Sequence, residues 1–127
     1  MQAFVIETAH HPGEVARVTG ALAARGINIT GLAAASIGER ATIIVLTSDE
    51  PGTRSAFRAA AITAREQEVV AASLEDRPGS AAEATRKLAE AGVNIDFCFG
   101  TGMRDGRIIV ALGVDQLEKA RTLLGAS

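Results

Sequence analysis

Asp76-Arg77-Pro78-Gly79-Ser80, an Ala- and Leu-rich run, and then Gly92-Val93-Asn94-Ile95-Asp96 form the stretch of sequence that decides the fold. Proline presets the φ angle of a helix start, and glycine accepts the left-handed backbone that ends a helix. The pattern therefore predicts a turn, a helix over residues 80–91 and a strand over residues 93–99. Such a helix start has unpaired N–H groups, and we expect it to hold a small anion together with the Asn of the adjoining strand.

The same pattern occurs earlier, as His10-His11-Pro12-Gly13-Glu14 followed by a helical run and Gly26-Ile27-Asn28-Ile29-Thr30. An offset of 66 residues places Pro12 on Pro78 and Asn28 on Asn94 without a gap. Repeats of this length are usually duplicated supersecondary units. The sequence therefore predicts two similar domains, residues 1–65 and residues 66–127.

Each repeat has the pattern β-α-β-β-α, with the segment Arg65–Glu75 expected to finish the first repeat and begin the second. The expected strands are 3–8, 27–37, 42–47, 93–99 and 107–114, and the expected helices are 14–25, 53–63, 80–91 and 115–124. This order predicts an α+β fold of two ferredoxin-like βαββαβ repeats, each an antiparallel sheet with its helices on one face.

Several side-chain placements follow from the spacing. Val15, Val18 and Leu22 lie on one helical stripe and are expected in the core. Alternation along strand 93–99 predicts Ile95, Phe97 and Phe99 on one face, with Cys98 on the other. Ser80 and Glu83 have the spacing of a capping box, Asp76 is an alternative cap for the same helix, and Asp115 is expected to cap the last helix.

The composition excludes several functions. The net charge is −2 with no basic run, and only four aromatic residues occur, so we expect neither nucleic acid nor an anionic membrane as a partner. A single cysteine fits a reducing compartment. No apolar run approaches the ~20 residues of a membrane span, and the N-terminus lacks the pattern of a signal peptide. We expect a cytoplasmic protein.

Catalytic and metal sites are not indicated. His10 and His11 are adjacent and point in different directions, and no third ligand has a telling spacing. Cys98 lacks an identifiable base partner, and no pair of carboxylates has a catalytic arrangement. We therefore expect no catalytic residue, no metal and no cofactor, and a protein that is not an enzyme.

The repeated x-Pro-Gly, a Leu ten residues after the Pro, and the following Gly-hydrophobic-Asn-Ile resemble the ACT domains of aspartokinases and other amino-acid enzymes. The resemblance covers both repeats and is closest to stand-alone tandem ACT proteins. It implies that a small amino acid binds where the Pro-Gly loop of one repeat meets the strand of its neighbour. The implied ligand-binding residues are Asp76, Arg77, Gly79, Ser80, Asn94 and Asp96 in the second repeat, and His10, His11, Gly13 and Asn28 in the first.

The family unit usually ends in a fourth strand, whereas this sequence stops three residues after the last expected helix. A sheet edge left open in this way invites pairing with another chain, so we expect a homodimer. The sequence thus predicts a non-catalytic, allosteric amino-acid-binding module. The alternatives are a structural or oligomerisation partner that regulates a separate enzyme or transcription factor, and a small ferredoxin-like enzyme.

Overall fold

The computed structural model describes residues 1–126, which form two compact units. The first unit is Gln2–Gln67, and the second begins at Glu68 and also includes Met1. The division lies inside the strand β4 (Arg65–Glu75), as expected for a segment that finishes one repeat and begins the next. Met1 belongs to the second unit because its carbonyl accepts a hydrogen bond of 2.9 Å from the N–H of Val69.

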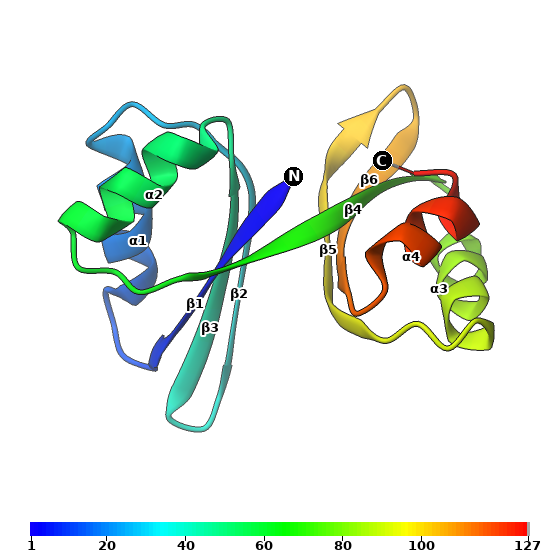
Figure 1. Cartoon of the computed structure of the whole chain (residues 1–127), viewed down its shortest axis with the longest axis horizontal. Helices are drawn as coiled ribbons and strands as arrows, with labels where there is room; N and C mark the ends of the chain where they lie inside the picture. Colours follow the sequence, from blue (N-terminus) through cyan, green and yellow to red (C-terminus); the bar gives the residue numbers. More distant parts are fainter. Residues whose placement is uncertain (127) are drawn as a thin grey trace. The chain divides into compact units, whose positions relative to one another are not determined.

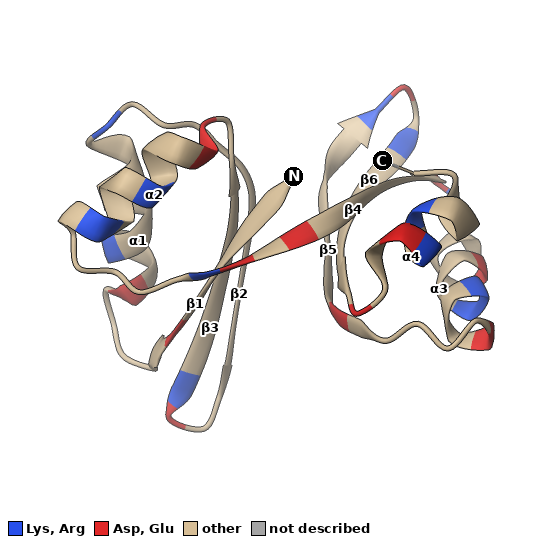
Figure 2. Ribbon diagram, in the orientation of Figure 1, with Lys and Arg blue, Asp and Glu red and all other residues tan. Residues whose placement is uncertain are grey.

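The first unit is an antiparallel sheet with two helices on one face (Figure 1). Its elements are β1 (Gln2–Ala9), α1 (Glu14–Ala23), β2 (Ile29–Ile37), β3 (Arg40–Thr47) and α2 (Glu50–Ala59). The central strand β3 pairs with β1 on one side and β2 on the other. Charged residues lie mainly on the helices and near the ends of the strands (Figure 2).

The second unit repeats this plan. Its elements are the latter part of β4, α3 (Ser80–Glu90), β5 (Ile95–Arg104), β6 (Arg107–Val114) and α4 (Leu117–Leu124). Here β6 is central and pairs antiparallel with β4 and β5. Within residues 1–126 no strand follows α4. The predicted α+β fold of two duplicated units, with helices on one face of each sheet, is confirmed (Figure 1).

Each unit has a core between its helices and its sheet. Equivalent leucines, Leu22 on α1 and Leu88 on α3, are both 0% exposed in these two cores. Phe4 and Phe57 meet edge to face in the first core, with ring centroids 5.8 Å apart. Burying a side chain of this size stabilises a fold by about 1.5–3 kcal/mol, so these residues fix each helix against its sheet.

The two Pro-Gly turns have the same backbone geometry. Gly13 has φ 95° and ψ −8°, and Gly79 has φ 88° and ψ −13°. These angles are close to those of the third residue of a type II turn, where glycine is required and proline is favoured just before it. In the second turn the N–H of Ser80 donates to the carbonyl of Arg77 at 3.3 Å, which closes the turn. The predicted Pro-Gly turn before each helix is confirmed.

The predicted helix caps are wrong at two helices. Gly79, not Ser80 or Asp76, is the N-cap of α3, and Glu83 pairs instead with Arg77 at 2.8 Å. The N-cap of α4 is Gln116, because the carboxylate of Asp115 accepts hydrogen bonds from Asn94. These carboxylates have stronger partners outside their own helices, which local spacing does not reveal.

The predicted face of the two phenylalanines in β5 is also wrong. The pairing register shifts between Ile95 and Phe97, so Asp96 is an extra residue in the strand. Such a bulge moves the following side chains to the opposite face. Ile95 therefore packs against the helix-side core, whereas Phe97 lies opposite Gly113 on the other face. A Cβ at Gly113 would lie 2.4 Å from the Phe97 ring, so this position has no room for a side chain.

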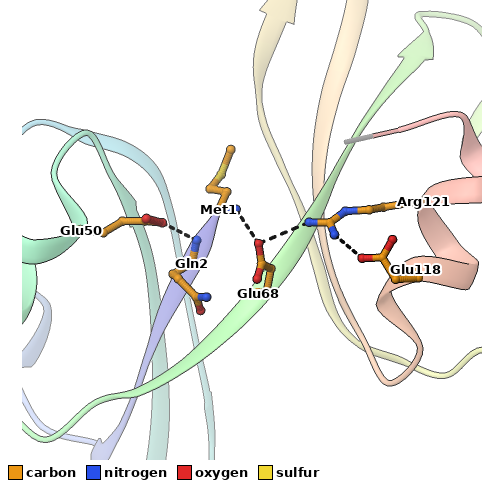
Figure 3. Close-up of polar contacts among 6 residues, drawn as sticks. All are labelled: Met1, Gln2, Glu50, Glu68, Glu118 and Arg121. Carbon is orange, nitrogen blue, oxygen red and sulfur yellow. Dashed lines mark hydrogen bonds and ion pairs between the residues drawn. The ribbon is translucent and has the colours of Figure 1, made fainter.

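Carboxylate groups accept hydrogen bonds from residues that are distant along the chain in each unit (Figure 3). In the second unit, Glu68 accepts from the amino terminus of Met1 at 3.2 Å and from Arg121 at 3.3 Å. In the first unit, the N–H of Gln2 donates to Glu50 at 2.5 Å. None of the helices in residues 1–126 is long and apolar enough to span a membrane.

Candidate ligand-binding site

An open cavity of about 350 Å³ lies within the first unit, beside the turn between β1 and α1. We call it the loop cavity. One wall is the turn and the first residues of α1, and the other is formed by β2 and β3. Its lining residues are Ala9, His10, His11, Pro12, Gly13, Glu14, Val15, Ala16, Ala34, Ala35, Ser36, Ala41 and Ile43.

The interior of the loop cavity is apolar. Ile43, a core residue with 1% exposure, forms part of its lining together with Ala34 and Ala41. Val15 was expected in the core with Val18 and Leu22, but it is 39% exposed and lines the cavity instead. The prediction failed for Val15 because the small alanines of β2, which line the same cavity, leave the space beside this first turn of α1 unfilled.

The start of α1 presents backbone donors to the cavity. Gly13 is the N-cap and has no side chain to bond the first-turn N–H groups. Its carbonyl accepts from the N–H of Arg17 at 2.8 Å, which is the first bond of the helix. The N–H groups of the preceding helical residues have no acceptor within the helix. Together with the helix dipole, they favour an anion at this position.

A carboxylate lies at the same end of the cavity. Oε2 of Glu14 accepts from the Thr8 hydroxyl at 2.8 Å and from Arg17 at 3.1 Å, and Oε1 lies 3.1 Å from Nε2 of His11. The side chain of Glu14 is 12% exposed. The hydrogen bond from Thr8 lowers the pKa of Glu14 most, followed by that from Arg17. Glu14 is therefore an ionised group in a fixed position.

The turn itself is anchored on both sides. The N–H of His10 donates to the carbonyl of Glu39 at 2.7 Å, which ties the turn to the β2–β3 hairpin. Nδ1 of His11 lies 3.1 Å from the carbonyl of Pro12. Of the four candidates predicted in the first repeat, His10, His11 and Gly13 line the cavity, and Asn28 does not.

An arginine lies at the equivalent turn of the second unit. Arg77 donates to Glu75 at 2.6 Å, to Glu83 at 2.8 Å and to the carbonyl of Pro78 at 3.3 Å. Glu83 first and Glu75 second raise the pKa of Arg77. The cavity beside this turn is about 200 Å³, and charged residues contribute much of its lining. The predicted residues Arg77 and Ser80 line it, whereas Asp76 and Gly79 do not.

The two asparagines lie at the far ends of their helices. Asn94 follows α3, whose 11 residues separate it from Gly79 by about 16 Å of helix. Its backbone N–H and side-chain amide donate to Asp115 at 2.9 and 3.2 Å. The carbonyl of Asn28 likewise accepts from the N–H of Ser48 at 3.0 Å. The expectation that the helix start and the Asn of one repeat form a single site is therefore wrong. Asp96, at the bulge of β5, is exposed and lines neither the loop cavity nor the cavity beside the second turn.

Sequence reasoning missed Glu14, Ala34 and Ile43 as site residues. The repeat offset indicates that Glu14 is unusual, because it aligns this acidic residue with the uncharged Ser80 directly after the shared Pro-Gly pair. The alanine-rich tract of β2 held a signal for the cavity, because small residues on an edge strand leave space beside a helix. No group of three or more His, Cys, Asp or Glu residues that could hold a metal occurs in the described part of the chain.

Solved structures share this fold at low sequence identity. Protein BT0572 from Bacteroides thetaiotaomicron matches with a TM-score of 0.86 and 21% identity over 98% of this chain and 85% of that chain. The ligand-free regulatory subunit of aspartate kinase from Thermus thermophilus matches with a TM-score of 0.66 and 21% identity, over 98% and 89% of the two chains. No curated protein matches the sequence.

Family comparisons agree with the duplicated architecture. The ACT domain matches residues 4–61, and the ACT domain pair matches residues 46–125. The second match alone covers more than half of the chain, and the two together span both units. The chain therefore belongs to the ACT domain family, as a pair of ACT domains.

Proposed function

We propose that this chain is a non-catalytic regulatory module that binds a small amino acid in the loop cavity. ACT domains are regulatory modules that bind amino acids. The observation that carries the proposal is the loop cavity itself, because it brings groups that attract both charges of a zwitterion to one end of an apolar hollow. Its volume of about 350 Å³ is within the range usual for small-molecule sites.

The α-carboxylate of the ligand binds the N–H groups of Val15 and Ala16, where the helix dipole favours negative charge. The α-ammonium binds Oε1 of Glu14, which lies 3.1 Å from Nε2 of His11. A carboxylate can accept about four hydrogen bonds, so Glu14 has capacity for this additional donor. His10, His11 and Gly13 complete the polar end of the site.

We propose one ligand per chain. The second turn differs from the first because the guanidinium of Arg77 already bonds two carboxylates and a carbonyl there. A ligand carboxylate at this turn would compete with Glu75 and Glu83 for the same donors. The second turn, with the predicted residues Asp76, Arg77, Gly79 and Ser80, then holds no ligand.

The proposed output is a change in the activity of another protein. We propose that ligand binding alters how this chain, acting in the cytoplasm as a homodimer, regulates a separate enzyme or transcription factor. One similar structure is described as the regulatory subunit of an aspartate kinase, and this similarity supports a regulatory role. An allosteric effect of this kind requires the partner to bind the liganded and free states with different affinity.

The test is a thermal-shift screen of the twenty amino acids, followed by calorimetric titration of the best one. A ligand at 100 times its dissociation constant should stabilise the protein by about 2.7 kcal/mol. The critical variant is Ala16→Phe, which places a large ring in the loop cavity. Its matched control is Ala82→Phe, at the equivalent third residue of α3, where the alanine is also exposed and lines neither the loop cavity nor the cavity beside the second turn.

We expect Ala16→Phe to lose at least tenfold in affinity, and Ala82→Phe to bind as the wild type does. Equal losses in both variants would place the ligand elsewhere. A screen in which no amino acid raises the melting temperature would contradict the binding proposal and favour a purely structural partner. A stoichiometry of two ligands per chain by calorimetry would contradict the proposal that each chain binds one ligand.

A further inference from the structure

We propose that the loop cavity selects amino acids with aliphatic side chains, such as valine and leucine. This inference rests on the proposed function, and it concerns the part of the cavity that holds the side chain of the ligand. The zwitterionic groups common to all amino acids bind at the start of α1. The remaining lining therefore determines which side chain is preferred.

That remaining lining is built from hydrocarbon. It consists of Ala9, Val15, Ala16, Ala34, Ala35, Ala41 and Ile43, with the exposed Ser36 as its polar member. A ligand side chain in contact with the exposed Val15 removes apolar surface from water on both sides of the contact, whereas Ile43 is already buried. Each buried methylene should raise the affinity about fourfold, which corresponds to ~0.8 kcal/mol.

Charged ligand side chains find no partner in this part of the cavity. This part of the lining contains no lysine, arginine or histidine, so an aspartate or glutamate side chain would remain unpaired there. Glu14 is the only carboxylate in the lining, and the α-ammonium of the ligand already requires it. A lysine side chain would therefore also be buried without a counter-charge, which is unfavourable.

Pairs of ligands with the same shape separate this selectivity from size. Valine and threonine differ by one methyl-to-hydroxyl exchange, and leucine and asparagine have nearly the same outline. We expect calorimetric titration to show valine binding roughly tenfold or more tightly than threonine, and leucine binding more tightly than asparagine by a larger factor. Affinity should rise from alanine to valine to leucine.

A charge introduced into the lining of the loop cavity tests the aliphatic preference by changing the protein instead of the ligand. Ala34→Asp introduces a carboxylate among the lining residues at an exposed position of β2, so the fold should be retained. The matched control is Gly100→Asp at the equivalent position of β5, where an added Cβ meets no atom within 4 Å. Ala34→Asp should lower the affinity for leucine at least tenfold and reduce the difference in affinity between leucine and lysine. Gly100→Asp should change neither quantity.

The outcomes distinguish the two proposals. Tighter binding of threonine, asparagine or a charged amino acid, with loss of that binding in Ala16→Phe, would overturn the aliphatic preference and leave the site in place. Leucine affinity unchanged in Ala34→Asp would also overturn it. Absence of binding by every amino acid would contradict the proposed function itself, and the inference with it.

Discussion

The strain at the two Pro-Gly turns gives a prediction that can be worked from backbone angles. Gly13 and Gly79 have φ of 95° and 88°, a region in which a residue with a Cβ is disfavoured by about 1–2 kcal/mol. A Cβ at Gly13 meets no atom within 4 Å, and a Cβ at Gly79 meets only the guanidinium of Arg77, at 3.9 Å. Alanine at either position should therefore lower the free energy of unfolding by about 1–2 kcal/mol through backbone strain alone.

Asparagine provides the internal control for this reasoning. It adopts positive φ more readily than alanine does, although its side chain is larger. If strain is the cause, Gly13→Asn and Gly79→Asn should each cost less than the corresponding alanine variant. If steric contact were the cause, asparagine would cost more.

The assay is urea unfolding followed by far-ultraviolet circular dichroism, because the chain contains neither tryptophan nor tyrosine for fluorescence. The four variants are compared with the wild type in the midpoint and slope of the transition. Alanine variants as stable as the wild type, or asparagine variants less stable than alanine variants, would refute the assigned turn geometry.

Three further predictions concern the cores, the acidic group of the site and the asparagine of the second repeat. Leu22→Ala and Leu88→Ala should each lower the free energy of unfolding by about 2–5 kcal/mol, and a loss below about 1 kcal/mol at either would contradict its full burial. The pKa of Glu14 is lowered by folding, so its stabilising effect is present above the unfolded carboxyl pKa and is lost as the pH falls through the folded value. Wild type and Glu14→Gln should thus differ most near neutral pH and converge in acid, and a gap in unfolding free energy that widens on acidification would show the opposite shift. Asn94→Ala should lower stability because it removes one bond to Asp115, yet calorimetry should give unchanged ligand affinity, whereas a tenfold loss would assign Asn94 to the ligand.

Much of the fold follows from the sequence because its signals are local. The Pro-Gly turns predict the starts of α1 and α3, and an apolar run rich in β-branched residues predicts β6 at its observed bounds, Arg107–Val114. The long segment Arg65–Glu75 is likewise one strand, β4. These features depend on backbone preferences that nearby residues set by themselves.

What the sequence did not predict depends on partners that are distant along the chain. Asp115 accepts a hydrogen bond from Asn94 instead of capping its own helix, because the pairing of β5 with β6 brings these two residues together. The bulge at Asp96 reverses the face of Phe97, and strict alternation cannot reveal an extra residue.

The candidate site was found only in part for a similar reason. The turn residues His10, His11 and Gly13 were identified from the repeat, but the opposite wall comes from Ala34 and neighbouring residues of β2. The first repeat carries the larger of the two cavities, and it has His11 at the position that Arg77 occupies in the second repeat. In the second repeat, Arg77 lies across the turn. Neither difference changes the Pro-Gly pattern that marks both turns.

The most direct test of the account is a crystal structure of the chain with a saturating concentration of leucine. We expect one leucine per chain, in the loop cavity, with its carboxylate at the N–H groups of Val15 and Ala16. Its ammonium should bind Glu14, and its side chain should pack against Ile43. Leucine bound at the turn of Arg77, or at Asn94, with the loop cavity empty would contradict the account.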